Sequence, residues 1–198
     1  MTRIEPAGLH DLPGAYRVCI GTARQGEDAT QDFRDPDLLG HVYVGPYLAQ
    51  SGGTQLVVVD DAGVAGYLLS TDDTRAFEAW AEAAWWPALR ARYPEATDPR
   101  EAWLVRQIHQ PPRAADAVVA GYPAHLHIDL LARARGLGLG RVLIERLLAE
   151  LRGRSVPGVH LGVDPANTNA IGFYEHLGFR VLERLPDEVV MGLRLDPG

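Results

Sequence analysis

The spacing of hydrophobic residues changes along this chain and predicts where helices and strands lie. Short apolar or alternating runs predict strands at 2–6, 55–60, 64–70, 159–163, 179–184 and 189–195. Apolar residues three and four positions apart predict helices at 9–23, 37–50, 74–93, 99–109 and 167–177. Asp61-Ala-Gly63 separates two strands and predicts a β-hairpin. Because helices and strands alternate in the second half, we expect a mixed α/β sheet.

Glycine and proline interrupt several of these segments. Gly45-Pro46 should break the helix at 37–50, Pro87 should break or restart the helix at 74–93, and Pro111-Pro112 should end the next one. The polar stretch at 21–35 is expected to be a loop. We interpret residues 1–198 as a single domain that carries a helical insertion at about 72–121.

The stretch 122–151 combines a strand, a tight turn and an amphipathic helix. The turn, Arg135–Arg141, contains three alternating glycines, which allow backbone angles and close approaches that a Cβ forbids. The first turn of the following helix has unpaired amides at the positive end of the helix dipole. Together these features predict a seat for a phosphate or pyrophosphate group. The spacing fits neither a dinucleotide-binding fingerprint nor a P-loop.

Read as Arg135-x-x-Gly138-x-Gly140, the turn resembles the acyl-CoA pyrophosphate loop of the GCN5-related N-acetyltransferases (GNAT). A second block, Asn167-Thr-Asn-Ala-Ile-Gly-Phe-Tyr-Glu-His-Leu-Gly-Phe179, resembles the last motif of the same superfamily. The two motifs occur in the family's order. The resemblance implies an α/β (α+β) GNAT fold, with a mixed, mostly antiparallel, splayed sheet flanked by helices.

Four further segments resemble the acetyltransferase-like C-terminal domain of O-GlcNAcases and its stand-alone bacterial relatives. They are 41–48, 64–69, 86–93 and 122–129. The chain is too short to include a glycoside-hydrolase domain, so this resemblance implies no sugar hydrolysis.

The resemblance also implies how acetyl-CoA is held. Backbone groups near Leu130, Leu131 and Ala132 would pair with the pantetheine arm, and Asn167 and Tyr174 would contact the cofactor from the last helix. The pyrophosphate would be bound by the residues of the turn, namely Arg135, Gly136, Leu137, Gly138, Leu139, Gly140 and Arg141.

The chemistry requires a proton donor for the thiolate and a base for the amine. Tyr174 is the expected donor, and the alternative is that it packs in the core. His125, His127 and Asp129 alternate along one strand, so their side chains should share one face. We rank Asp129 first and His127 second as the base, although any of the three could instead be structural.

Composition narrows the function further. The net charge of −7 argues against a nucleic-acid partner. No apolar run is long enough to span a membrane, and the N-terminus lacks a signal pattern, so we expect a cytoplasmic protein. Cys19 is the sole cysteine, and we expect no metal. All 19 basic residues are arginine, which suggests a bacterial origin.

The leading hypothesis is an acetyl-CoA-dependent N-acetyltransferase in which the amine attacks directly within a ternary complex. The alternatives are an inactive acetyl-CoA-binding (pseudo-acetyltransferase) module and an O-acetyltransferase. The acceptor could be a small amine or a protein or peptide lysine, and the chain could be a monomer or a homodimer. A set of aromatic residues could form the acceptor pocket or the core of the inserted helices: Tyr43, Tyr47, Tyr67, Trp80, Trp85, Trp86 and Trp103.

Overall fold

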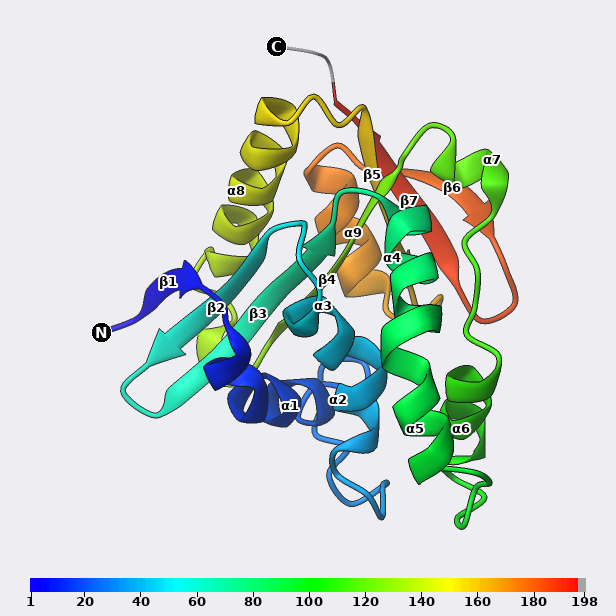
Figure 1. Cartoon of the computed structure of the whole chain (residues 1–198). Helices are drawn as coiled ribbons and strands as arrows, with labels where there is room; N and C mark the ends of the chain where they lie inside the picture. The colour runs from blue at the N-terminus through cyan, green and yellow to red at the C-terminus, as the bar shows by residue number, and fades with distance from the viewer. Residues whose placement is uncertain (196–198) are drawn as a thin grey trace.

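A seven-stranded mixed sheet organises the computed structural model, which describes residues 1–195 (Figure 1). The strand order is β1-β2-β3-β4-β5-β7-β6, and only the β4–β5 pair is parallel. This confirms the expected mixed, mostly antiparallel sheet. The strands are β1 (Arg3–Pro6), β2 (Gln55–Asp60), β3 (Gly63–Thr71), β4 (Ala124–Leu130), β5 (Gly158–Val163), β6 (Arg180–Arg184) and β7 (Val189–Arg194).

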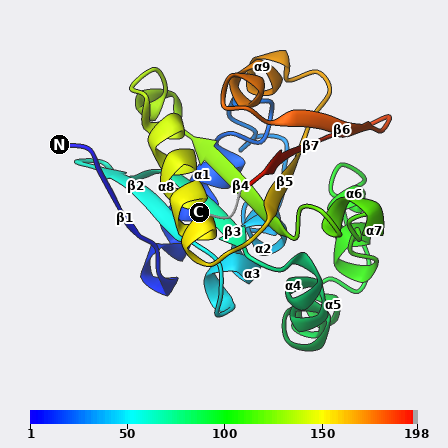
Figure 2. The same cartoon turned by 90° about the horizontal axis from the view of Figure 1, so that it is seen from above.

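Helices cover both faces of the sheet, and each face has its own hydrophobic core (Figure 2). One core joins the sheet to α8 (Leu139–Gly153) and α9 (Thr168–His176). The opposite core joins it to α1 (Leu12–Ile20), α2 (Leu38–Tyr43) and α3 (Gly45–Ala49), as well as to the inserted helices. Strands β2 and β3 contribute side chains to both cores, whereas β4, β5 and β7 contribute buried apolar side chains to the core under α8 and α9.

The region predicted to be an insertion contains α4 (Thr74–Trp80), α5 (Trp86–Arg92), α6 (Ala102–His109) and α7 (Asp116–Val119). A π-helical turn, η2 (Ala81–Trp85), connects α4 to α5, and Pro87 lies in the first turn of α5. A proline cannot donate to the preceding turn and clashes with the carbonyl four residues earlier. The wider turn accommodates it, so the expected break at Pro87 takes the form of a change in helix type.

Other boundaries differ from the prediction in detail. The helix predicted at 9–23 begins with a 3-10 turn, η1 (Leu9–Asp11), and ends at Ile20. The helix predicted at 99–109 starts only at Ala102, because Asp98 closes a turn by accepting the Arg100 amide. Two short elements were not predicted, namely α7 and the 3-10 helix η3 (Ala132–Ala134).

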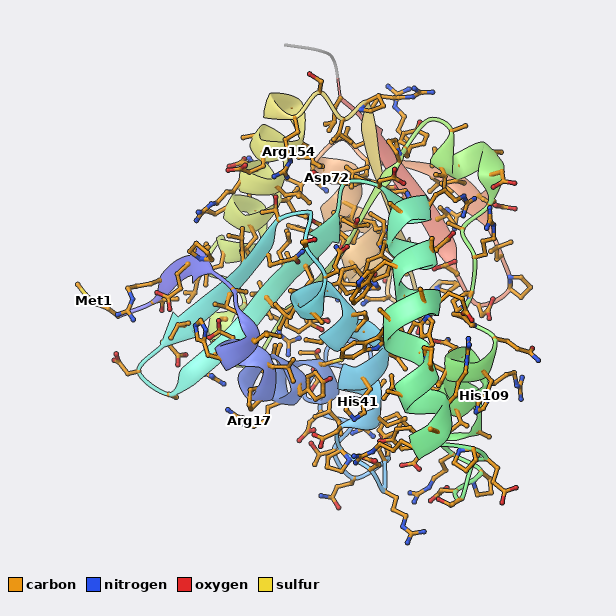
Figure 3. The ribbon with its side chains drawn as sticks, viewed as in Figure 1. Met1, Arg17, His41, Asp72, His109 and Arg154 are labelled. Carbon is orange, nitrogen blue, oxygen red and sulfur yellow. The ribbon has the colours of Figure 1, made fainter. Side chains whose placement is uncertain are left out.

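The far end of α8 is fixed to the connection between β3 and α4 by an ion pair. Arg154 Nε lies 2.8 Å from Asp72 Oδ2, and the same arginine donates to Thr54 Oγ1 at 2.7 Å (Figure 3). These contacts join residues from both halves of the chain. They fix the helix whose other end carries the glycine-rich turn.

Candidate active site

The sheet opens at its centre. β4 and β5 pair only through Ala124–Val159 and His125–His160, and beyond these pairs the two strands diverge. The opening forms a cleft. Its lining residues come from β4, the end of β5 and α9: Leu126, His127, Ile128, Asp129, Leu161, Gly162, Val163, Asp164, Asn167, Ala170 and Tyr174. The expected splay is therefore present where the two sequence motifs meet.

The glycine-rich turn has the geometry of an anion seat. Gly136 and Gly138 both have φ of +74°, a conformation that side-chain-bearing residues rarely adopt, and Gly138 forms the N-cap of α8. Gly140 is needed for a different reason, because a Cβ there would lie 3.3 Å from the Phe173 ring on α9. Within residues 1–195, the amides from Gly136 to Arg141 donate to no backbone acceptor. They remain available at the positive end of a 15-residue helix.

The arginines that flank this turn differ in their contacts. Arg135 donates to the Gly26 carbonyl at 2.7 Å and lies 4.0 Å from Glu27. Arg141 is exposed and lies 3.4 Å from Glu145 on its own helix. Arg135 therefore connects the turn to a distant loop, whereas Arg141 remains on the surface of α8.

Unpaired backbone groups line the β4 side of the cleft. Leu131 donates its amide to Ala65 on β3 at 2.9 Å, and Ala132 begins η3. Because successive residues of a strand direct their backbone groups to opposite sides, Ile128 and Leu130 face the opening instead. Leu130 therefore faces the opening, whereas the Leu131 amide is already bonded to Ala65. That Leu130, Leu131 and Ala132 hold the pantetheine arm stays a prediction.

The last helix contributes two predicted residues to the cleft. Asn167 is the N-cap of α9, where its Oδ1 accepts the Ala170 amide at 3.1 Å. Tyr174 is buried beside Phe173 and Phe179 but still lines the cleft. Burial, followed by the negative charge of Asp129, raises the pKa of the Tyr174 hydroxyl above its usual value. The group therefore stays protonated and can donate a hydrogen bond.

The structure places His125, His127 and Asp129 on one face of β4, as predicted. Both ring nitrogens of His125 are engaged, with the Tyr47 hydroxyl 2.6 Å from Nε2 and Thr74 Oγ1 2.8 Å from Nδ1. Burial holds the pKa of His125 well below its ordinary value. These contacts assign His125 a structural position within the core.

In contrast to His125, His127 and Asp129 each border open space. Burial lowers the pKa of His127 to about 4. Burial raises the pKa of Asp129 to about 6, against the opposing effect of the Tyr67 hydroxyl, which donates to Asp129 Oδ2 at 2.5 Å. At pH 7 both side chains lack a proton, and Asp129 is the stronger base.

A second cavity lies on the opposite side of these two residues, against α1, α2 and α6. Its lining residues are Cys19, Thr22, Ala23, Phe33, Leu39, Tyr43, Trp103, His127 and Asp129. His127 and Asp129 therefore line both cavities. A molecule in one cavity could reach a molecule in the other at these side chains.

Sequence reasoning missed most of this second cavity. Thr22 and Ala23 lie where the helix predicted at 9–23 overlaps the loop predicted at 21–35, and Phe33 lies within that loop. No local pattern marks any of the three as cavity residues. Of the aromatic candidates, Tyr43 and Trp103 line the cavity, and Trp103 is 42% exposed. The other five belong to the core or pack against it: Tyr47, Tyr67, Trp80, Trp85 and Trp86.

Comparison with known proteins agrees with this geometry. The model of the acetyltransferase (GNAT) family matches residues 27–179. The solved structure of SsHAT superposes with a TM-score of 0.88 and 35% identity, covering 98% of both chains. The chain therefore belongs to the GNAT acetyltransferase family, as the two motifs indicated.

Two further relatives are informative. Protein O-GlcNAcase of Mus musculus is 25% identical over an aligned stretch of 199 residues, which covers 95% of this chain but 21% of that protein. The chain thus spans about a fifth of that relative's length. The structure of yncA from Salmonella typhimurium, which contains its cofactor acetyl-CoA, has a TM-score of 0.60 at 20% identity and covers 99% of this chain and 95% of that one. This last likeness concerns the fold alone.

Residues 1–195 also lack a membrane-spanning helix and a metal-ligand cluster. None of the helices described there combines the length and apolar character that crossing a membrane requires. The same residues contain no group of three or more His, Cys, Asp or Glu side chains arranged to hold a metal ion.

Proposed function

We propose that the chain transfers the acetyl group of acetyl-CoA to an amine by direct attack within a ternary complex. The observation that carries this proposal is the meeting of two cavities at His127 and Asp129. One cavity lies between β4, the end of β5 and α9, and the other is lined by residues of α1, α2 and α6. Family membership supports the use of acetyl-CoA.

The cofactor would occupy the opening between β4 and β5. The amides from Gly136 to Arg141 would bind its pyrophosphate, with Arg135 or Arg141 adding positive charge. Backbone groups of Ile128 and Leu130 would pair with the pantetheine arm, which would lie alongside β4 like an added strand. The acetyl thioester would then reach the level of Asp129 and Tyr174.

The acceptor would enter through the second cavity. An alkyl amine has a pKa of about 10.4, so a base is needed to hold its nitrogen unprotonated at pH 7. Asp129 would take that proton, because its raised pKa of about 6 keeps it ionised yet sufficiently basic. The unprotonated His127 would accept a hydrogen bond from the same amine.

The transfer itself balances within this site. The nitrogen lone pair attacks the carbonyl carbon, the carbon–sulfur bond breaks, and the sulfur leaves as a thiolate. The further proton that the nitrogen loses on becoming an amide is released to solvent or to that thiolate, which becomes the coenzyme A thiol. The Tyr174 hydroxyl would donate a hydrogen bond to that thiolate. A phenol is a weaker acid than a thiol of pKa about 8.5, so stabilisation rather than full proton transfer is expected.

A thiol-release assay over a panel of amines, peptides and amino sugars would test this function. We expect acetyl-CoA-dependent release of coenzyme A with at least one amine, and mass spectrometry should identify the acetylated product. Acetyl-CoA binding in calorimetry without release on any acceptor would contradict catalysis and leave an acyl-CoA-binding module. Release with alcohols but not with amines would indicate O-acetylation.

A further inference from the structure

One loop contacts both cavities. Residues 21–37, called the bridging loop here, connect α1 to α2 and contribute Thr22, Ala23 and Phe33 to the second cavity. On the cofactor side, the loop is held by Arg135, which donates to the Gly26 carbonyl at 2.7 Å. Gln25 Nε2 adds a bond to Asp164 Oδ2 at 3.2 Å. Near α2, the bridging loop is held by a different residue.

That residue is Glu101. Its side chain is only 5% exposed, and within residues 1–195 it is the single Asp or Glu among the buried polar residues. One oxygen, Oε1, accepts the Arg34 amide at 2.6 Å and the Asp35 amide at 2.8 Å. A buried carboxylate is costly unless such bonds satisfy it, so this pairing fixes the loop against α6.

The two ends of this contact carry aromatic walls of the cavity. Phe33 directly precedes Arg34, and Trp103 lies two residues after Glu101 in the first turn of α6. One turn further along the same face, Gln107 Oε1 accepts a hydrogen bond from the Tyr43 hydroxyl at 3.0 Å. The relative placement of Phe33, Tyr43 and Trp103 therefore depends on how α6 is attached.

We propose that Glu101 is the positioning residue of the acceptor pocket, and that Phe33 and Trp103, held by it, select amines with a flat apolar body. The inference rests on the proposed function, because it takes the second cavity to be the acceptor site. Glu101 touches no reacting atom in this scheme. Its effect reaches the acceptor through the two aromatic side chains.

Calorimetry can test this without turnover. The probes are 2-phenylethylamine and n-butylamine, each titrated into protein saturated with coenzyme A. We expect wild type to prefer 2-phenylethylamine by about tenfold, a difference that one well-packed ring can supply. Glu101→Ala should remove this preference while coenzyme A affinity stays within about twofold, since the anion seat is distant in the fold.

A matched variant separates geometry from charge. Because both amides bond to the same oxygen, Glu101→Gln keeps an acceptor in place and should retain most of the preference, restoring what Glu101→Ala loses. Trp103→Ala alters an exposed side chain, so it should fold normally and still reduce 2-phenylethylamine affinity.

Five outcomes test the two proposals separately. Equal binding of the two amines by wild type would overturn the selection. Unchanged 2-phenylethylamine affinity in folded Glu101→Ala would overturn the positioning role. If Glu101→Ala fails to fold, the 2-phenylethylamine affinity of Trp103→Ala decides whether the aromatic wall selects the amine. Weak 2-phenylethylamine binding by Glu101→Gln would overturn the explanation that an acceptor atom at this position, rather than its charge, holds the loop. Glu101-dependent amine binding without any thiol release would refute the proposed catalysis and leave this inference standing.

Discussion

The two cavities share His127 and Asp129, but the rest of their lining consists of different kinds of groups. The cofactor cleft uses backbone amides, a strand edge and helix termini, and its parts lie close together in sequence between β4 and α9. The acceptor pocket uses side chains from α1, the bridging loop, α2, α6 and β4. A backbone-built site requires particular glycines, whereas a side-chain-built site can change its walls without altering the fold. Under the proposed function, this division would let one cofactor site serve different acceptors.

Gly138→Val should give the largest effect among the substitutions that test this comparison. A β-branched residue at φ +74° is strained, and its side chain would disturb the amides that face the pyrophosphate. Losing two charge-assisted hydrogen bonds as well should weaken acetyl-CoA binding by about 1000-fold in calorimetry.

Gly153→Val is the matched control for this change. Gly153 lies at the opposite end of α8, where a Cβ would meet nothing within 4 Å. Its acetyl-CoA affinity should match wild type. Near-normal binding by a folded Gly138→Val protein would contradict a backbone-built cofactor site.

Asp129→Asn tests the point where the cavities meet. Removing the base should lower kcat/KM by about 100-fold at pH 8. In wild type, kcat/KM should fall as the pH drops through about 6, where Asp129 takes up its proton. The pH–rate profile of Asp129→Asn should lack this acid limb, whereas His127→Gln should retain it. An unchanged limb in Asp129→Asn would assign the base elsewhere.

The same substitution has a stability effect of known sign. Asp129 has a higher pKa folded, at about 6, than its ordinary value of 3.8, so the folded protein binds its proton more tightly. The resulting stabilisation is complete below pH 3.8 and is lost as the pH rises through 6. Relative to wild type, Asp129→Asn should therefore gain about 2–3 kcal/mol in free energy of unfolding between pH 4 and pH 8. Urea denaturation at both pH values measures this difference.

Tyr174→Phe sharpens the assignment of the cleft. Removing one hydrogen bond to a developing thiolate should lower kcat by about 10- to 100-fold. Acetyl-CoA affinity should stay close to wild type, because the ring and its contacts with Phe173 and Phe179 remain. Stopped-flow or steady-state thiol release measures the difference. Equal turnover by the two proteins would identify Tyr174 as core.

The smallest expected effect separates the two arginines of the turn. Arg135→Ala should weaken acetyl-CoA binding about 3- to 10-fold and also raise the acceptor KM, since Arg135 holds the bridging loop. Arg141→Ala should affect only the cofactor, because its ion pair is with Glu145 on its own helix, α8. An identical profile for both variants would show that the loop contact has no role in acceptor binding.

The two motifs on the cofactor side could be recognised in the sequence for a physical reason, and the cofactor contacts of their residues stay predictions. Residues such as Gly138 and Asn167 act through local backbone geometry, and local geometry is visible in a short motif. The splayed sheet followed from the family resemblance and is confirmed. The sequence could not predict which backbone groups of β4 face the cleft, because the direction of the Leu131 amide depends on pairing with Ala65 in a distant strand.

The acceptor side could not be predicted in the same way. Phe33 and Trp103 are 70 residues apart in sequence, and only the packing of the bridging loop against α6 brings both to one cavity. Glu101 carries no signal in the sequence, since its role depends on two amides of the bridging loop. Even His125, equivalent to His127 by spacing, differs only because Tyr47 and Thr74 occupy its nitrogens.

The two residue pairs that join β4 to β5 also bear on how the protein opens. They are the only ladder between strands β1–β4 and strands β5–β7 in the described chain, so this seam should part more readily than any other pairing. Amide hydrogens beside it, such as those of Ile128 and Leu130, should exchange with solvent early. A bound pantetheine arm would bridge the seam and slow that exchange, which makes the ligand a structural partner of the sheet.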